Sequence, residues 1–203
     1  FFVDGYKFFS TCSCDLTCFA FLMVATIYTI GHSSHSVGTF FKLLRAYGIT
    51  GIVDVRSIPA SGRFPHFKKA KLARHCEEHN VEYIWLGQEL GGRDEEGIET
   101  KLQREAGKVA LARLLSLATQ SSGAGVLGSA CLGDVPHRPA KYCLMCSEAH
   151  WTNCHRRFIG EALVSTGCIQ VVHLNIDSSM ETHSLGSLHI TSPSYPNLGA
   201  VEK

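Results

Sequence analysis

The sequence of 203 residues has little net charge and no long uninterrupted hydrophobic run. Its 19 basic and 18 acidic side chains leave a net charge of +1, so there is no global basic field to attract DNA or an anionic membrane. The apolar run at residues 18–30 is too short to span a bilayer. We therefore expect no membrane partner, and nucleic acid only through a local patch.

A regular cysteine framework is also missing. The nine cysteines are odd in number and irregularly spaced, which makes a set of disulfides a poor explanation for them. We therefore expect a reduced, cytoplasmic protein. The first methionine is Met23, and residues 1–24 are interpreted as an extension outside the domain, either a fragment or gene-model extension or a weak targeting segment.

What the sequence does contain is a globular composition, with 45% hydrophobic and 18% charged residues. Apolar runs alternate with amphipathic stretches of helical length, which predicts a single-domain α/β fold with a mostly parallel sheet of about five strands flanked by helices. The domain is expected at residues 25–177, with an inserted loop at 120–140 and a flexible tail at 178–203. The strands are expected at residues 27–30, 51–55, 81–86, 142–146 and 168–174.

Helices are expected between these strands. The first follows the hydroxyl side chains of residues 33–36 and ends at Gly48. The others are expected at residues 68–79, 100–118 and 154–165.

Four of the expected strands run into residues that carry chemistry. The first leads to His32, the second to Arg56, the fourth to Cys146 and Glu148, and the last to His173. In an open parallel sheet, ligands bind beyond the carboxyl ends of the strands. We therefore expect His32, Arg56, Cys146 and Glu148 to face one small volume.

The densest group of reactive residues follows the fourth strand, where Cys146 and Glu148 precede Cys154, His155 and Arg156. A helix beginning near Cys154 would offer free amides and a partial positive charge, which bind anions and stabilise a thiolate. This pattern predicts a lowered pKa for Cys154, a nucleophilic Cys146 and an acid–base role for Glu148. The alternative is that both cysteines are small buried apolar residues and that Glu148 caps the helix.

Zinc is a second interpretation of this segment, because Cys143, Cys146, Cys154 and His155 are all zinc-ligand types. On a strand, Cys143 and Cys146 would point to opposite faces, and the adjacent Cys154 and His155 would diverge at a helix start. The sequence therefore predicts no metal, and it indicates no other cofactor.

The second strand ends on Asp54 and Arg56, which lie on the same face, followed by Ser57. Arg56 is suited to hold a carboxylate or phosphate with two hydrogen bonds while Asp54 orients it. A structural ion pair explains the two residues equally well. His32 is a candidate acid or base, or simply a turn residue.

These motifs together resemble the domain of unknown function 488 family, over about residues 27–174. The resemblance implies a compact cytosolic α/β protein whose defining motif includes Cys146, Glu148, Cys154, His155 and Arg156. It implies no reaction, since the family is named for lacking one. The segments that carry the resemblance occur in order at residues 28–33, 53–59, 65–67, 90–92, 145–148 and 154–156.

The leading hypothesis is an enzyme-like site for an anionic small molecule or a nucleotide, including thiol-dependent catalysis. The alternative is a non-catalytic nucleic-acid or nucleotide-binding module that uses the basic and aromatic residues at 63–71. A purely structural interaction protein is the third reading. The expected catalytic residues are Cys146, Glu148, Cys154 and His32, and the expected substrate-binding residues are Arg56, Asp54, Ser57, His155 and Arg156.

Overall fold

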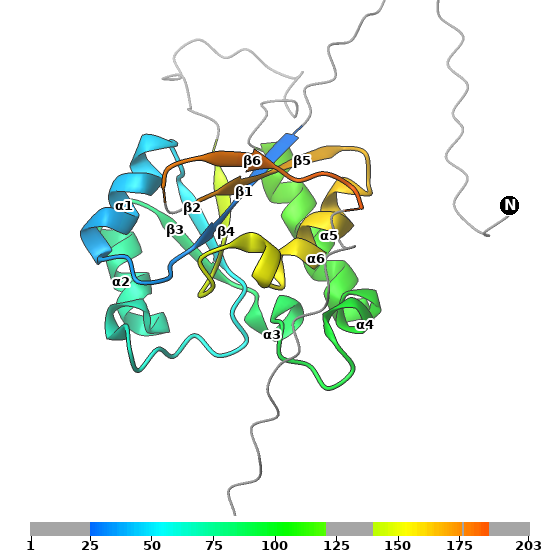
Figure 1. Cartoon of the computed structure of the whole chain (residues 1–203), viewed down its shortest axis with the longest axis horizontal. Helices are drawn as coiled ribbons and strands as arrows, with labels where there is room; N and C mark the ends of the chain where they lie inside the picture. Colours follow the sequence, from blue (N-terminus) through cyan, green and yellow to red (C-terminus); the bar gives the residue numbers. More distant parts are fainter. Residues whose placement is uncertain (1–24, 121–139, 176, 187–203) are drawn as a thin grey trace, which may run out of the picture.

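The computed structural model describes residues 25–120, 140–175 and 177–186, and shows one sheet between helices (Figure 1). The sheet has six strands in the order β3-β2-β4-β1-β5-β6. The first five strands in this order are parallel to one another, which confirms the expected α/β fold with a mostly parallel sheet. These five are β1 Ala25–Gly31, β2 Gly51–Asp54, β3 Glu82–Trp85, β4 Tyr142–Cys146 and β5 Ile169–Leu174.

The sixth strand, β6 (Met180–Thr182), pairs antiparallel with β5 at the edge of the sheet. It lies in the segment that was expected to be tail. All three of its residues are exposed, so it lacks the alternation of apolar and polar residues that marks a half-buried strand. The expected extension at 1–24, nearly all of the expected inserted loop and residues 187–203 lie outside the described residues.

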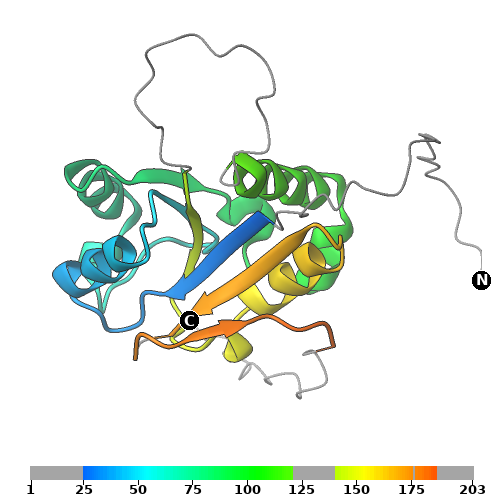
Figure 2. The ribbon, with the colours of Figure 1, turned by 90° about the horizontal axis from the view of Figure 1, so that it is seen from above.

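Helices cover both faces of the sheet (Figure 2). On one face lie α1 (Val37–Ala46) and α2 (Lys69–Glu78), and on the other α5 (Glu105–Gln120) and α6 (Arg156–Val164). Each face has its own apolar core. Cys143 belongs to the core under α1 and α2, whereas Cys146 belongs to the core under α5 and α6, so the two point to opposite faces as their spacing predicted. The short helical segments are η1 Pro65–Phe67, α3 Gly87–Leu90, α4 Ile98–Gln103 and η2 Trp151–Asn153.

The expected helix at 100–118 is instead two helices, α4 and α5, separated at Arg104. Arg104 has an extended backbone, with ψ at 157°. Its guanidinium donates to Asp94 and to Glu96, each at 2.9 Å. A Cβ on Gly107 would lie 2.4 Å from the Lys101 carbonyl oxygen, so glycine lets α4 pack closely against the first turn of α5.

The strand order creates a topological switch point between β1 and β4. The connections after β1 and β2 run through α1 and α2 on one face, and those after β3 and β4 run through α5 and α6 on the other. Adjacent strands whose connections leave over opposite faces form a crevice at their carboxyl ends, where ligands bind in such folds. Among the described residues, no helix combines the length and apolar character needed to cross a membrane.

Candidate active site

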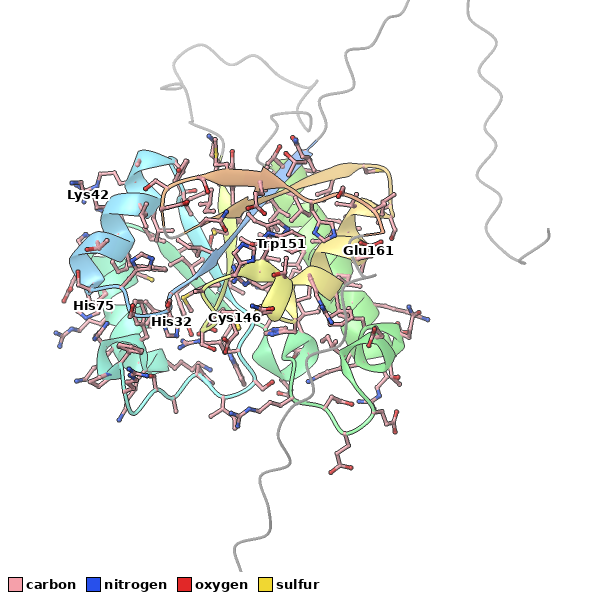
Figure 3. All side chains as sticks on the ribbon, in the orientation of Figure 1. His32, Lys42, His75, Cys146, Trp151 and Glu161 are labelled. Atoms are coloured by element: carbon pink, nitrogen blue, oxygen red, sulfur yellow. The ribbon has the colours of Figure 1, made fainter. Side chains whose placement is uncertain are left out.

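A cavity of about 910 Å³ opens at the carboxyl ends of β1, β2 and β4. His32 follows β1 and Cys146 ends β4 (Figure 3). Their backbones are joined by a hydrogen bond of 2.8 Å from the His32 amide to the Cys146 carbonyl. The expectation that four strand-end residues share one volume is confirmed. The expected site residues that line the cavity are His32, Arg56, Ser57, Cys146, Glu148, Cys154 and His155.

Arg56 is held at the cavity wall by Asp54, which is completely buried. The guanidinium donates from Nε to Asp54 Oδ1 at 2.8 Å and from Nη2 to Oδ2 at 2.6 Å. Tyr83 donates its hydroxyl to the same carboxylate at 2.7 Å. Because Arg56 has five N–H groups and three point at Asp54 and His32, one hydrogen on each Nη is left for a ligand. Asp54 itself does not line the cavity.

His32 accepts a hydrogen bond from Arg56 through the lone pair of its Nε2. Its Nδ1 lies 3.1 Å from the Ser33 carbonyl, which can only accept, so Nδ1 carries the proton and Nε2 accepts from Arg56 Nη1 at 3.2 Å. The ring also stacks on Phe67, with 4.2 Å between centroids. This geometry fixes Arg56 and leaves His32 without a free basic nitrogen.

Two thiols and one imidazole form a cluster at the cavity floor, which we call the Cys–His cluster: Cys146, Cys154 and His155. His155 Nδ1 lies 3.7 Å from the sulfur of each cysteine. The expectation that Cys154 and His155 diverge is wrong, because the helix begins later than expected. Cys154 is extended (φ −127°, ψ 150°), and His155 caps α6 in a helical conformation, which brings both side chains to the same point.

The environment separates the acidities of the two thiols. Burial raises the pKa of Cys154, but a hydrogen bond from Cys146 and the charge of Arg156 outweigh burial and lower this pKa to about 6. The hydrogen bond to Cys154, together with burial, raises the pKa of Cys146 to about 12. The proton shared by the pair therefore resides on Cys146.

Arg156 lies behind the cluster and outside the cavity lining, at 1% exposure. Its Nε donates to the Cys154 sulfur at 3.3 Å, and its Nη2 donates to the Glu148 carbonyl at 2.7 Å. In this position Arg156 orients Cys154 and the loop that carries Glu148. A ligand in the cavity would not touch Arg156 directly.

A row of buried hydrogen bonds runs from Arg156 to the surface near β6. Arg156 Nη1 donates to Thr29 Oγ1 at 3.4 Å, and Thr29 lies 2.7 Å from His173 Nδ1. His173 Nε2 lies 2.9 Å from His183 Nδ1, and His183 Nε2 lies 3.0 Å from Glu161 Oε2. The Glu161 carboxylate only accepts, so His183 donates to it from Nε2. His173 in turn donates from Nε2 to His183 Nδ1, and Thr29 donates its hydroxyl to His173 Nδ1, so every bond in the row has one donor and one acceptor.

Sequence reasoning did not find most of this row. Beyond Arg156, only His173 stood out, as the end of a strand, whereas Thr29 is an interior strand residue and His183 comes from the expected tail. Trp151, from η2, stacks on His173 with 4.0 Å between centroids and encloses the row. These partners are far apart in sequence, and no local pattern joins them.

Two arginines of the cavity lining, Arg63 and Arg93, were not among the expected small-molecule site residues. Arg63 was considered only for nucleic acid. The Arg93 amide donates to Ser57 Oγ at 3.0 Å, which fixes the loop that follows Gly91 and Gly92. A Cβ on Gly92 would lie 2.7 Å from His155 Cγ, so the glycine pair allows this loop to pack on the cluster.

The basic and aromatic segment at 63–71 gives little support to the alternative of nucleic-acid binding. Phe67 is completely buried, so it has no free face for a base. The Lys69 ammonium lies 3.7 Å from the centroid of the Trp85 ring, where it already makes a cation–π contact.

The buried histidines predict a loss of stability in mild acid. Burial and the charge of Arg56 lower the pKa of His32 to about 4, and burial and His183 lower that of His173 to about 3, from 6.5 in both cases. Because both folded pKa values are depressed, the stability is complete above pH 6.5 and falls as the unfolded chain gains protons below it. Each group contributes about 1.4 kcal/mol per pH unit, so the unfolding free energy should drop by about 2–3 kcal/mol from pH 6 to pH 5.

Urea unfolding at these two pH values measures this drop, and His173→Gln should remove about half of the histidine contribution. An unfolding free energy that stays constant from pH 6 to pH 5 would contradict neutral burial of the two rings.

The family model described as "Domain of unknown function DUF488" matches residues 36–163, more than half of the chain. No curated protein matches the chain, and no solved structure matches it.

Proposed function

The chain belongs to the DUF488 family, and we propose that its cavity is the active site of an enzyme that acts on an anionic small molecule or a nucleotide. The observation that supports this function is the meeting of arginine side chains with the Cys–His cluster at the switch point of the sheet. Binding groups and reactive groups then share one cavity. Its volume of about 910 Å³ lies within the range of cavities that hold drug-sized ligands.

Anion binding would come from Arg56, Arg63 and Arg93. The charge of Arg56 is largely cancelled by Asp54, so Arg56 acts at short range through its two free N–H groups. Arg63 and Arg93 add two further positive charges to the cavity lining, in which Glu148 is the one carboxylate among the described residues. The preferred ligand is therefore an anion whose oxygens reach all three side chains.

Reactivity would come from the thiols. His155 Nε2 lies 2.9 Å from the Val55 carbonyl, so this nitrogen carries the proton and the lone pair of Nδ1 faces both sulfurs. In the proposed step, His155 Nδ1 takes the proton that the two thiols share. A thiolate sulfur then bonds to the electrophilic atom of the substrate. The leaving group departs with its electron pair and receives the proton that His155 Nδ1 has taken up. We assign His32 the role of positioning Arg56.

The proposal predicts that anions protect the cavity thiols from alkylation. In EDTA-treated protein, iodoacetamide labelling of Cys146 and Cys154, followed by mass spectrometry, should slow when inorganic phosphate, pyrophosphate or AMP is added. The exposed Cys168 is an internal control whose labelling should not change. Protection that is absent, or equal at Cys168, would refute an anion site beside the thiols.

A matched pair of variants tests the arginines. Arg93→Met should raise the concentration needed for half protection about tenfold, as expected for a charge-assisted hydrogen bond worth about 1.5 kcal/mol. Arg113→Met removes an exposed arginine from α5, outside the cavity lining, and should leave protection unchanged.

A further inference from the structure

We propose that Cys146, Cys154 and His155 are three ligands of a site for a divalent metal ion, with zinc the best fit, and that the fourth coordination position faces the cavity. The inference relies on the proposed function only for the anion that would occupy this fourth position. The three donor atoms, two Sγ and one Nδ1, all lie within 4.8 Å of one another.

The spacing of these atoms fits a tetrahedral zinc ion. With Zn–S near 2.3 Å and Zn–N near 2.0–2.1 Å, tetrahedral angles hold sulfur and nitrogen ligands about 3.6 Å apart. Both observed distances from His155 Nδ1 to a cysteine sulfur are 3.7 Å. The ligands therefore need little rearrangement to bind the ion.

The orientation of His155 is also that of a metal ligand. Histidine ligands usually donate their second ring nitrogen to a carbonyl or carboxylate, which fixes the tautomer. Here Nε2 donates to the Val55 carbonyl at 2.9 Å, and the bare Nδ1 faces the sulfurs. Gly92 packs directly against His155, because a Cβ on Gly92 would lie 2.7 Å from Cγ, 2.8 Å from Cβ and 2.9 Å from Nδ1 of His155. The ring is thus held both by its hydrogen bond to Val55 and by the close approach of Gly92.

The charge balance suits a buried ion. Zinc binding releases to solvent the proton that the two thiols share, and a doubly charged cation with two thiolates is neutral. Arg156 Nε donates to the Cys154 sulfur at 3.3 Å and would stabilise that thiolate as a ligand. Thiolate and imidazole donors select zinc over magnesium or calcium.

Two sulfurs and one nitrogen leave a tetrahedral ion with one open position, which is the arrangement of catalytic zinc sites. All three ligands line the cavity with Arg56, so water or the bound anion would complete the coordination. Metal binding and free-thiol chemistry are alternative states of one cluster, because a coordinated thiolate is not available as a nucleophile.

The test is a titration of the EDTA-treated full chain with Zn²⁺ alone, in competition with a chromophoric chelator. We expect one ion per chain, and Co²⁺ in its place should give a sulfur-to-cobalt charge-transfer absorption band. Cys146→Ser and Cys154→Ser should each weaken binding by more than about 100-fold, beyond the loss typical of second-shell partners. Cys168→Ser and the triple change of Cys12, Cys14 and Cys18 to serine should retain wild-type uptake.

Wild-type protein gives a readout that does not depend on how the variants fold. Zn²⁺ should block iodoacetamide labelling at Cys146 and Cys154 while Cys168 is still labelled. Stoichiometric uptake that survives in both single variants, or labelling that Zn²⁺ does not change, overturns the metal site. If phosphate still protects the thiols in EDTA, the metal inference alone fails. If Zn²⁺ binds but no anion protects, the proposed function fails.

Discussion

Asp54→Ala is expected to destabilise the protein by about 3–5 kcal/mol, the usual result of leaving a buried charge without its partner. Asp54 accepts from the Arg56 backbone amide at 3.1 Å, from two guanidinium nitrogens and from the Tyr83 hydroxyl. Removing the carboxylate leaves Arg56, which is 5% exposed, with no counter-charge. The change in the free energy of unfolding in urea measures the effect.

Two controls make this result specific. Arg104→Ala breaks the two ion pairs of a half-exposed arginine, with Asp94 and with Glu96, and should cost at most about 1 kcal/mol. Arg56→Met combined with Asp54→Ala should recover part of the loss, because the unpaired charge is then gone. If Asp54→Ala alone costs no more than Arg104→Ala, Asp54 does not compensate Arg56 as described.

Gly31→Ala is expected to destabilise the protein and, in addition, to disrupt the site. A Cβ on Gly31, at the end of β1, would lie 1.8 Å from the carbonyl oxygen of Glu148 and 2.7 Å from its carbon. Both are backbone atoms, so the chain after Cys146 must move, and overpacking of this kind costs about 1–3 kcal/mol or more. Urea unfolding and the anion-protection assay should both detect the change.

Gly38→Ala is the matched control for Gly31→Ala. No atom lies within 4 Å of a Cβ built on Gly38, which is inside α1. Alanine there should stabilise the protein by about 0.4–1 kcal/mol and leave the cavity unchanged. Equal stability of the two variants would show that the contact between Gly31 and the loop at Glu148 does not constrain the fold.

The sequence predicts the fold well because its strongest signals are local. Alternation of apolar runs with amphipathic helices specifies a mostly parallel sheet, and the carboxyl ends of parallel strands meet at one edge. That is why His32, Arg56 and Cys146 were expected to face one volume, and they do. The edge strand β6 was not predicted, because its three exposed residues have no periodic pattern.

The arrangement within the site was less predictable. The convergence of Cys154 and His155 depends on backbone torsions before α6, which the sequence does not specify. The position of Arg156 behind the cluster depends on Thr29, 127 residues away in the chain. Such long-range contacts can be found only in the folded arrangement.

The hydrogen-bonded row behind the cluster gives the outermost strand an influence on the thiols. His183 directly follows β6, and its amide pairs with the Val171 carbonyl at 2.9 Å. A competing strand that displaced β6 from β5 would take the His183 imidazole away from His173. The contact between His173 and Thr29 would then lose its support, and so would the hydrogen bond from Arg156 to Thr29. A change at the edge of the sheet would then loosen the contact between Arg156 and the Cys154 sulfur, without any ligand in the cavity.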